Sequence, residues 1–478
     1  MGRQGDRGRG QERGPAPGDA ASHGQAGRGG ARAPRQDHPC GRRASGFREA
    51  WPGRRDPVRE PGLSPVAIFA DPCRDRRGQE HDHHLPCPGR RDLDVHEEEL
   101  TEAGLADISG PLGLYVHVPF CSGKCGYCDF TSFPGQGHAV FRYLEALKAE
   151  ARLVNPGRDP ETLYVGGGTP SELSAGEIAQ LFAALHVSFP AAKFIETTFE
   201  VNPESVNEEK LGVLRLAGVT RLSLGLQALD DDVLKAVGRR HTARDSLRAF
   251  AAARKAGGWS ISLDIICGLP GQSRDGFLEG LARVLELGPD HLSIYGLDLH
   301  DGTPLARSGY AADEDLGRDM LEAAMDRVEA AGLAHYEISN FARPGHESRH
   351  NLNYWKGGEY IGLGCAAASY LDGVRSRNVA DLETYFDCLR QGKRPLAESE
   401  RLSGVEKSGE AAMLGLRLVR GFEPSPDVAR QFDSKIRGLI ERSLLRREQG
   451  KLQLTREGIF LANQVFMEFV PPFEESNI

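Results

Sequence analysis

The feature that most restricts the fold of this chain is a regular alternation of short strands and helices that begins at Gly113. In its first segment, GLYVHV, apolar residues occupy every second position, as in a strand. Strands that are each followed by a helix are typical of a parallel α/β sheet or barrel. We therefore predict strands at residues 113–118, 162–165, 195–201, 220–225, 260–266 and 291–295, with helices at about 138–153 and 315–331.

Three cysteines follow the first strand and carry the strongest chemical signal. Cys121, Cys125 and Cys128 have the spacing C-x3-C-x2-C. Gly123 and Gly126 allow the loop to turn tightly enough for the sulfurs to converge. Converging thiolates suit a soft metal centre, and an iron–sulfur cluster is the natural occupant. With only three protein ligands, one iron of a [4Fe-4S] cubane would stay open to an outside ligand.

Two other interpretations of these cysteines are weaker. A disulfide with a spare thiol would suit a secreted protein, and nothing else in the chain has that character. Structural zinc normally has four ligands in two separated pairs. Tyr127, between the last two cysteines, places an aromatic ring beside the open corner of a cluster. We therefore predict iron and sulfide rather than zinc.

Charge and cysteine usage exclude several classes of protein. The net charge of -9 argues against nucleic acid as the main partner. No apolar run is long enough to span a membrane and no signal peptide precedes the predicted barrel, so we expect no integral membrane segment. The chain has nine cysteines, scattered apart from the cluster loop, which fits a reducing cytoplasm.

Residues 1–95 differ from the rest of the chain. They are dense in Gly, Arg, Pro and Gln and almost free of branched apolar residues, so we predict a disordered low-complexity extension. Interspersed acidic residues disfavour an RNA-binding arm, and irregular spacing disfavours a metal site at 81–87. Because no methionine lies between Met1 and Met320, we also expect an over-extended start, with the true start at a codon read here as Val or Leu, for example Val95.

Glycine and polar residues stand at the C-terminal ends of the predicted strands, where functional groups gather in barrels of this kind. The second strand runs into GGGTP at 166–170, whose glycines expose backbone groups to the polar end of a ligand. Glu200, Gln227 and Asp264 stand at the ends of the next three strands. Each signal alone is weak, since a glycine run often marks only a turn and an acidic strand end is often a loop cap. Together they predict a site lined by several strands.

The cysteine loop resembles the signature of the radical S-adenosylmethionine (SAM) proteins, C-x3-C-x-aromatic-C. The resemblance implies that the open iron chelates the amino and carboxylate groups of SAM. It also implies an electron donor, because the reduced cluster splits the sulfonium into a 5′-deoxyadenosyl radical. The GGGTP segment matches the loop that holds the methionyl amino group of SAM in this branch.

From about residue 112 to 470 the chain is similar to the coproporphyrinogen III oxidase-like (HemN-like) subgroup of these proteins. This resemblance implies a partial (β/α)6 barrel, open on one side for a large substrate. It assigns contacts with cluster-bound SAM to Tyr115, Gly167 and Glu200. It assigns a second SAM or substrate site to Tyr127, Gly168, Thr169, Gln227, Arg239 and Asp264.

The segment HNLNYW begins at His350. From residue chemistry alone, a histidine among aromatic residues is more simply a satisfied structural histidine. An imidazole beside Tyr354 and Trp355 is equally suited to haem, with an axial nitrogen and flat walls. The motif H-N-x-x-Y-W resembles that of the HemW haem chaperones in this subgroup. The resemblance implies haem as a cofactor bound by His350, and haem-accepting proteins as partners.

The C-terminal region has an expected helix at Ala411–Val419 and a hairpin at Leu444–Leu454 that turns at Gly450, a winged-helix-like layout. Such folds often bind DNA, but the acidic balance and the family favour a lid packed on the barrel. The predicted organisation is a disordered extension (1–95), a radical SAM barrel (112–300), an extension with the haem motif (301–395) and a winged-helix-like domain (400–478). The sequence leaves open whether the chain forms a homodimer.

Three functions compete: a haem chaperone, an oxygen-independent coproporphyrinogen III oxidase, and a radical SAM methyltransferase. The oxidase carries a further cysteine two residues beyond the last ligand, where this chain has Phe130. A methyltransferase would need a methyl-carrying device such as a cobalamin domain, and none is visible. The chaperone is therefore favoured and no coproporphyrinogen oxidase activity is expected. Ala368 stands where family members often have a histidine, which puts haem affinity in question.

Overall fold

The computed structural model describes residues 110–154 and 157–471. The predictions for residues 1–95, of disorder and of a start near Val95, lie outside the described residues. All statements below concern the described part of the chain.

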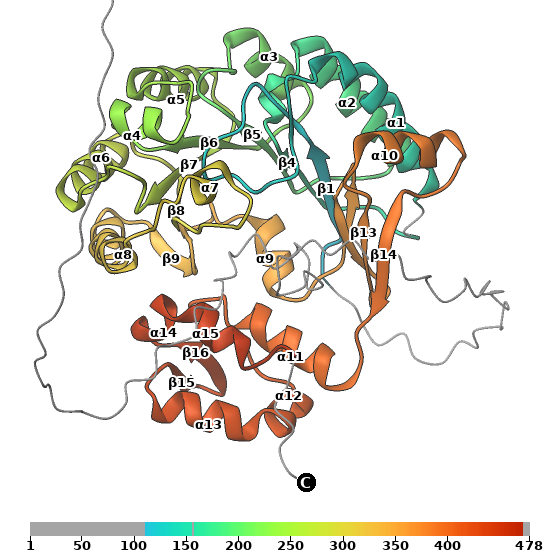
Figure 1. The fold of residues 1–478 in the computed structure, drawn as a ribbon. Coiled ribbons are helices and arrows are strands. Elements are labelled where there is room, and N and C mark those ends of the chain that lie inside the picture. The colour runs from blue at the N-terminus through green and yellow to red at the C-terminus, as the bar shows by residue number, and fades with distance from the viewer. Residues whose placement is uncertain (1–109, 155–156, 472–478) are drawn as a thin grey trace, which may run out of the picture. The chain divides into compact units, whose positions relative to one another are not determined.

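The core of the fold is a run of parallel strands that confirms the partial barrel (Figure 1). Neighbours in the sheet follow chain order: Gly113 pairs with Thr162 and Thr162 with Glu196, whereas Thr198 pairs with Arg221. Each predicted strand is present within two residues of its expected ends. The strands are β1 (Gly113–Val118), β4 (Thr162–Gly167), β5 (Glu196–Val201), β6 (Arg221–Gln227), β7 (Ser260–Cys267) and β8 (His291–Gly296).

Helices follow these strands and cover the outer face of the sheet (Figure 1). Their starts are set by local sequence: Ser174 and Thr242 each form a capping box with the acidic residue three positions on. Side chains such as Leu147, Leu181 and Val284 then pack on the buried strands. The helices are α1 (Val140–Leu153), α2 (Ala175–Ser188), α3 (Glu208–Leu216), α4 (Asp231–Ala236), α5 (Ala243–Ala256), α6 (Arg274–Glu286), α7 (Pro304–Arg307) and α8 (Glu314–Ala330).

The sheet continues beyond both edges of the barrel strands into an open order of twelve strands. β11 is parallel to β1, and the remaining added strands are antiparallel to their neighbours. A short parallel pair, β2 and β3, brackets the cysteine loop. The separate pair is β2 (Phe120–Cys121) and β3 (Phe133–Pro134). The strands added to the sheet are β9 (Ala334–Glu337), β10 (Asn340–Ala342), β11 (Tyr360–Leu363), β12 (Ala368–Leu371), β13 (Val374–Asn378) and β14 (Leu396–Arg401).

The C-terminal region has the predicted order of helices followed by a hairpin, although no comparison identifies it as a winged helix. Gln449 and Gly450 both have positive φ (51° and 82°), which makes the tight turn that Gly450 predicted. The helix expected at Ala411–Val419 instead spans Gly404–Gly415. The elements are α10 (Leu382–Arg390), α11 (Gly404–Gly415), α12 (Pro426–Gln431), α13 (Asp433–Glu441), β15 (Leu445–Glu448), β16 (Lys451–Leu454), α14 (Arg456–Phe460) and α15 (Ala462–Met467).

Helix α9 (Arg349–Trp355) lies between the barrel strands and the C-terminal helices (Figure 1). Arg417, just after α11, is fully buried there. Its guanidinium stacks over the ring of Trp355, 4.1 Å from the ring centre, and lies 3.6 Å from the carboxylate of Glu337. A buried ion pair of this kind fixes the position of the C-terminal helices against α9 and β9 more than it adds stability.

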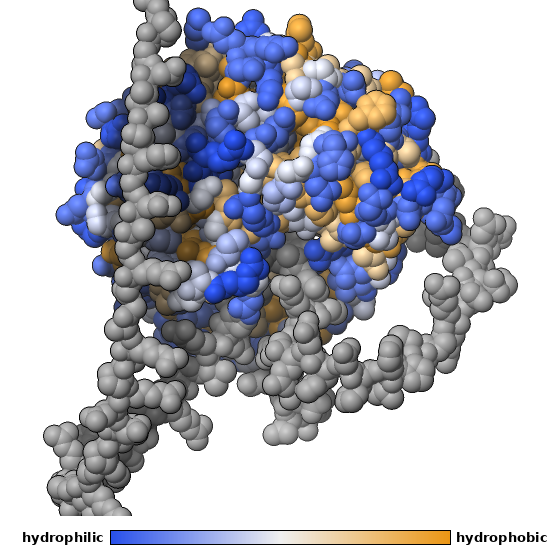
Figure 2. All heavy atoms as spheres, turned by 45° about the horizontal axis from the view of Figure 1, so that its top comes forward, coloured by the Kyte–Doolittle hydropathy of each residue, from blue (hydrophilic) through white to orange (hydrophobic). Residues whose placement is uncertain are grey.

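The surface toward the viewer in Figure 2 is mainly hydrophilic, with apolar areas on the side where Figure 1 places α1 and α10. Exposed apolar side chains include Phe141 on α1 and Val187 on α2. Within residues 110–154 and 157–471, no helix has the length and apolar character that crossing a membrane requires.

Candidate functional site

The loop with the three cysteines is fixed by the backbone of Gly126. Its N–H donates to the carbonyl of Val237 (2.9 Å), and its carbonyl accepts from the N–H of Leu305 (2.8 Å). The loop is thus tied to the segments that follow α4 and begin α7. The thiols that it presents are all free and partly exposed: Cys121, Cys125 and Cys128.

A chain of polar contacts from separate strand ends connects two of these cysteines. Sγ of Cys121 lies 3.4 Å from Oγ1 of Thr169, which accepts from Nδ2 of Asn202 over 3.2 Å. Oδ1 of Asn202 accepts from the guanidinium of Arg239 over 2.9 Å, and another nitrogen of that group lies 3.7 Å from Sγ of Cys125. The structure thus brings the predicted Thr169 and Arg239 to the cysteine loop, together with Asn202.

The three thiols lie on one loop and are compatible with an iron–sulfur cluster. Among the described residues, no group of three or more His, Cys, Asp or Glu side chains is arranged to hold one metal ion. In a cubane each thiolate bonds its own iron, so the sulfurs need not converge on one point. Hydroxyl and guanidinium donors beside Cys121 and Cys125 are the kind of group that tunes a cluster through its sulfurs. Burial raises the pKa of the Cys128 thiol to about 11.

Tyr127, beside the last cysteine, packs its ring on the small apolar cluster of Val233, Val237 and Ile266. Burial raises the pKa of its phenol, and the positive charge of the nearby Arg239 only partly opposes this shift. Tyr127 is therefore a neutral phenol at the edge of the cysteine loop.

The glycine turn after β4 is shaped by close contacts that only glycine permits. Gly167 has φ +110°, and a Cβ on it would lie 2.5 Å from Nδ1 of His117. A Cβ on Gly168 would lie 2.8 Å from the carbonyl oxygen of Phe120. Real Cβ atoms do not come this close, so both glycines are required by packing against β1 and β2.

The expectation that the glycines of this turn present their N–H groups to a ligand is wrong for Gly167 and Gly168, and the N–H of Thr169 is also occupied. The N–H of Gly167 donates to Glu200 (3.1 Å), that of Gly168 to Val118 (2.8 Å) and that of Thr169 to the carbonyl of Phe120 (2.8 Å). Protein acceptors in the adjacent strands compete successfully for these donors.

Glu200, near the end of β5, is the carboxylate that contacts this turn. Its carboxylate accepts from the hydroxyl of Tyr164 (2.7 Å) and from the N–H of Gly167 (3.1 Å). Burial raises the pKa of Glu200 to about 7, although the hydrogen bond from Tyr164 opposes the shift. The carboxyl group can therefore change its charge near neutral pH when a ligand arrives.

Tyr115 lies in the same interior layer. Nε2 of His117 bonds the carbonyl of Thr131 (2.8 Å), so this nitrogen carries the proton and Nδ1 accepts from the hydroxyl of Tyr115 (3.0 Å). The rings of Tyr115 and Tyr164 are 6.2 Å apart. The predicted contacts Tyr115, Gly167 and Glu200 therefore belong to one polar group inside the barrel.

Gln227 ends β6 in a left-handed conformation, with φ +64°, that is uncommon for a residue with a side chain. A Cβ on Gly225 would lie 2.7 Å from Nε2 of Gln227 and 3.1 Å from Oδ1 of Asn202. The glycine thus leaves room for the amide of Gln227 beside Asn202 and Arg239. Backbone strain of this kind is concentrated at functional sites.

Asp264 ends a chain of hydrogen bonds that crosses the barrel. It accepts from the hydroxyls of Ser223 (2.6 Å) and Ser262 (2.9 Å). Oγ of Ser262 lies 2.8 Å from Nδ1 of His291, whose Nε2 lies 2.8 Å from the hydroxyl of Tyr336. Burial raises the pKa of Asp264. Sequence reasoning identified Asp264 but missed His291 and Tyr336, because no spacing links them to β7.

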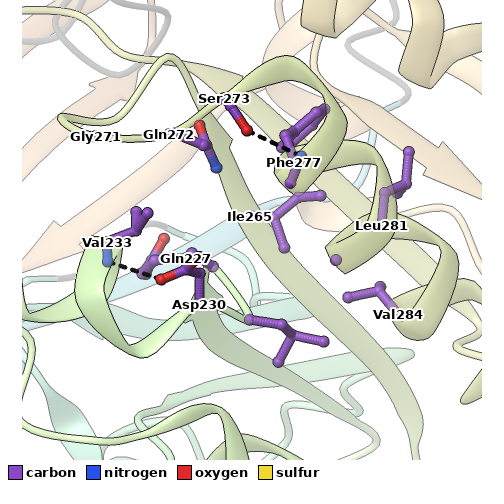
Figure 3. A pocket seen from close by; sticks show the side chains of 14 residues that line it. Gln227, Asp230, Val233, Ile265, Gly271, Gln272, Ser273, Phe277, Leu281 and Val284 are labelled. Atoms are coloured by element: carbon purple, nitrogen blue, oxygen red, sulfur yellow. Dashed lines mark hydrogen bonds between the residues drawn. The ribbon is translucent and has the colours of Figure 1, made fainter.

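A small, partly open hollow of about 50 Å³ lies between α4 and α6, and Figure 3 shows its lining. Two of its polar side chains are helix caps: Asp230 accepts from the N–H of Val233, and Ser273 accepts from the N–H of Gly276. The remaining lining is mainly apolar, with Gln227 at one edge. This hollow therefore neighbours the polar site but does not contain its charged groups.

His350 lies at the opposite end of the barrel strands from the cysteine loop. Its Nδ1 is 2.9 Å from Oγ1 of Thr162, the first residue of β4, and its Nε2 is 2.7 Å from the hydroxyl of Tyr354. The backbone N–H of His350 donates to Glu196, the first residue of β5. The side chain is fully buried. Both ring nitrogens of His350 therefore already have hydrogen-bond partners within the protein, including the one expected to bind haem iron.

Tyr164 connects this end of the barrel to the glycine turn. Its ring is 5.4 Å from the ring of His350, and its hydroxyl donates to Glu200. The HNLNYW motif and the carboxylate below the turn thus contact the same side chain. Sequence reasoning did not select Tyr164, although it stands only two residues before the glycine run in the same strand.

Comparison with known proteins gives consistent matches. Residues 115–284 match the model of the radical SAM superfamily. The chain is 34% identical over 374 residues to the heme chaperone HemW of Bacillus subtilis, covering 74% of this chain and 98% of that protein. It is 37% identical to the heme chaperone HemW of Mycobacterium tuberculosis, covering 76% and 96% of the two chains.

A solved structure also matches over most of the chain. It is the coproporphyrinogen III oxidase HemN of Escherichia coli, a radical SAM enzyme. The match has a TM-score of 0.66 and 26% sequence identity, and it covers 76% of this chain and 91% of that one.

Proposed function

The chain belongs to the HemW family of HemN-like radical SAM proteins, and on this basis we propose that it is a haem chaperone. It would bind a [4Fe-4S] cluster, SAM and haem, and pass haem to haem-dependent proteins. The observation that carries the proposal is the identity to HemW proteins over nearly their whole length, with the H-N-x-x-Y-W segment kept as α9.

The cluster would be held by Cys121, Cys125 and Cys128, and when bound it supplies the electron for reductive cleavage of SAM. The free thiols and the donors beside two of them support this assignment. The free state of all described cysteines also supports a reducing, cytoplasmic location.

SAM would be bound by acceptors at the C-terminal ends of the strands. Carbonyl oxygens of the turn at Gly167 and the carboxylate of Glu200 are suited to an ammonium group. The pKa of Glu200, about 7 in the protein alone, would fall beside that cation, so the carboxylate would be ionised in the complex. Arg239 and Gln227 lie beside the cysteine loop, where they are placed to orient a carboxylate or a second ligand.

The competing proposal is coproporphyrinogen III oxidase, which the fold match supports. Phe130 argues against the oxidase. It stands at the position of the additional oxidase cysteine, where its exposed side chain (41%) offers no thiol. Both proposals need the cluster and SAM; they differ in haem binding and in turnover of coproporphyrinogen.

A single anaerobic preparation tests both. After reconstitution with iron and sulfide, the protein is titrated with hemin and then assayed with coproporphyrinogen III, SAM and a reductant. We expect about four irons per chain, saturable hemin binding, and no formation of protoporphyrinogen IX. Turnover at enzymatic rates would replace the chaperone proposal with the oxidase.

A further inference from the structure

The cysteine loop is closed by one exposed side chain, that of Lys124. Lys124 directly precedes Cys125, and its Nζ donates to the carbonyl oxygen of Phe130 over 2.6 Å and to Oγ of Ser132 over 3.1 Å. Both acceptors come after Cys128 in the chain. The side chain therefore reaches across the loop, and the last two cysteines lie in the segment that its contacts enclose.

The positive charge of Lys124 is held in place without being neutralised. Among the residues that the structure describes, Lys124 forms no ion pair, and its two acceptors are an uncharged carbonyl and an uncharged hydroxyl. Fixing this long side chain at two points costs conformational entropy, which a lysine left in solvent would not lose. The loop thus keeps a full positive charge at a defined place.

This charge acts on two of the three thiols. Burial raises the pKa of the Cys128 thiol to about 11, and the positive charge of Lys124 is the main effect that opposes the shift. Burial also raises the pKa of the Cys121 thiol, and it is opposed by hydrogen bonds, one of them from Ser132, and by the charge of Lys124. Because Oγ of Ser132 accepts from Lys124, its own hydrogen is free to point at Cys121.

The other cation beside the thiols, Arg239, has different contacts. It is half-buried, and its guanidinium donates to Oδ1 of Asn202 (2.9 Å) and to the carbonyl of Gly225 (3.0 Å). Arg239 thus joins the loop to the strand ends, whereas Lys124 contacts only the cysteine loop and the residues that directly follow it. Replacing Lys124 should therefore leave the polar groups at the strand ends in place.

A fixed positive charge at this place favours the uptake of an electron. A [4Fe-4S] cluster gains one negative charge when it accepts one electron, and no bond has to form or break. A nearby cation stabilises this reduced state by Coulomb attraction, and a hydrogen bond to a ligand sulfur acts in the same direction.

We propose that Lys124 is a positioning residue of the cluster site, which closes the loop after Cys128 and raises the reduction potential of the cluster through its charge. The inference rests on the proposed function, because it needs the cluster at the three cysteines. It adds to that function a residue that controls how easily an electron donor can reduce the site.

The test is a potentiometric titration of the reconstituted full chain, with dithionite as the electron donor and the EPR signal of the reduced cluster as the readout. Lys124→Gln keeps a hydrogen-bond donor but removes the charge. Its midpoint potential should fall by about 40 mV, which is about a fivefold change in the one-electron equilibrium constant, the size expected for one exposed charge interaction. Lys124→Arg keeps the charge and should stay close to the wild type.

Lys255→Gln is the matched control, because it removes the same charge from a lysine that is 81% exposed in the last turn of α5. Salt separates the charge from the loop contacts. The difference between the wild type and Lys124→Gln should be smaller in about 0.5 M KCl than in about 0.05 M KCl, since salt screens an exposed charge. A shift caused only by a loosened loop would be the same at both concentrations.

The outcomes separate this role from the proposed function. The EPR signal comes only from chains that hold a cluster, so partial loading does not alter the midpoint. If the wild type binds no iron, the cluster assignment itself is overturned. If it binds iron but Lys124→Gln matches Lys255→Gln, the function stands and Lys124 has no such role. Equal shifts in Lys124→Gln and Lys124→Arg, or a shift that does not depend on salt, would also exclude it. Complete loss of the cluster from Lys124→Gln but not from Lys124→Arg would support it.

Discussion

The hydroxyl of Tyr354 and Nε2 of His350 are 2.7 Å apart, and Thr162 occupies the other ring nitrogen at 2.9 Å. Burial lowers the pKa of His350 to about 3, so the imidazole is neutral throughout the physiological range. A haem iron could reach this nitrogen only after Tyr354 had moved. The motif histidine thus has, in this structure, the structural role that its chemistry alone suggested.

Replacing His350 should therefore affect both stability and haem binding. His350→Ala removes a buried ring and leaves Tyr354 and Thr162 without their partner, so we expect a loss of roughly 2–4 kcal/mol in the free energy of unfolding. Hemin binding should weaken because the Tyr354 ring is released, while iron content stays unchanged. Tyr354→Phe, which keeps the ring, should weaken hemin binding less. Unchanged hemin affinity in His350→Ala would contradict this role.

The cluster assignment predicts loss of iron on removal of a single thiol. Cys125→Ala should lose most of the roughly four irons, because two thiolates do not retain a cubane. Cys388→Ala is the control, since Cys388 is free and lies on α10, away from the cysteine loop. Iron, sulfide and zinc would be measured after anaerobic purification. Zinc in place of iron, or iron retained in Cys125→Ala, would refute the assignment.

Because Gly167 lies so close to His117, we expect that adding a single methyl group at this position will strongly reduce stability and SAM binding. Gly167→Ala combines a φ of +110° with a Cβ 2.5 Å from the imidazole, so we expect roughly 2–4 kcal/mol of destabilisation and loss of SAM binding. Gly176→Ala on α2, where a Cβ meets nothing within 4 Å, should be neutral or slightly stabilising. Urea unfolding and SAM titration distinguish the two. Equal behaviour of both variants would show that the turn adapts.

Glu150 predicts a pH dependence of stability. It is fully buried on α1 and accepts from Gly364 (2.8 Å), Tyr385 (2.7 Å) and Asn378 (2.5 Å). Burial raises its pKa from 4.5 to about 7, despite these hydrogen bonds. Between these values the folded state binds the proton more tightly than the unfolded state, so stability falls as pH rises, by up to roughly 3 kcal/mol.

The measurement for Glu150 is urea unfolding of the cluster-free chain between pH 4.5 and 8. The wild-type curve should fall with pH more steeply than that of Glu150→Gln, whose amide does not titrate. Glu145→Gln, on the same helix but 59% exposed, should keep the wild-type slope. Parallel curves for the wild type and Glu150→Gln would show that the shift is absent.

The barrel could be predicted because its signals are local. The strand that begins at Ser260 is rich in apolar residues and is followed by a glycine. These local signals placed its end within one residue of the observed end at Cys267. Helix α11 was misplaced because its first turns carry exposed residues such as Val405 and Lys407, and only its later part is buried. Apolar periodicity cannot detect such an exposed start.

The site was only partly predictable because its contacts join distant segments. The three cysteines are visible in eight consecutive residues, whereas the contact of His350 with Thr162 spans 188 positions. Asn202 and Tyr164 carry ordinary side chains. Only the order of the strands brings Asn202 to the cysteine loop, and Tyr164 to Glu200 and His350. Resemblance to a family assigns ligand contacts, which stay predictions, and it could not show which atoms are already occupied within the protein.

The side chain of Tyr164 contacts His350 at one end of the barrel and Glu200 at the other, so the two ligand regions share one rigid ring. The strand that carries it is about 17 Å long, counted from Thr162 to Gly167. If SAM shifts this ring and thereby changes the affinity for haem, then haem must change the affinity for SAM by the same factor. Haem release to a partner would then be adjustable by the supply of SAM, with no need for the sulfonium to be cleaved.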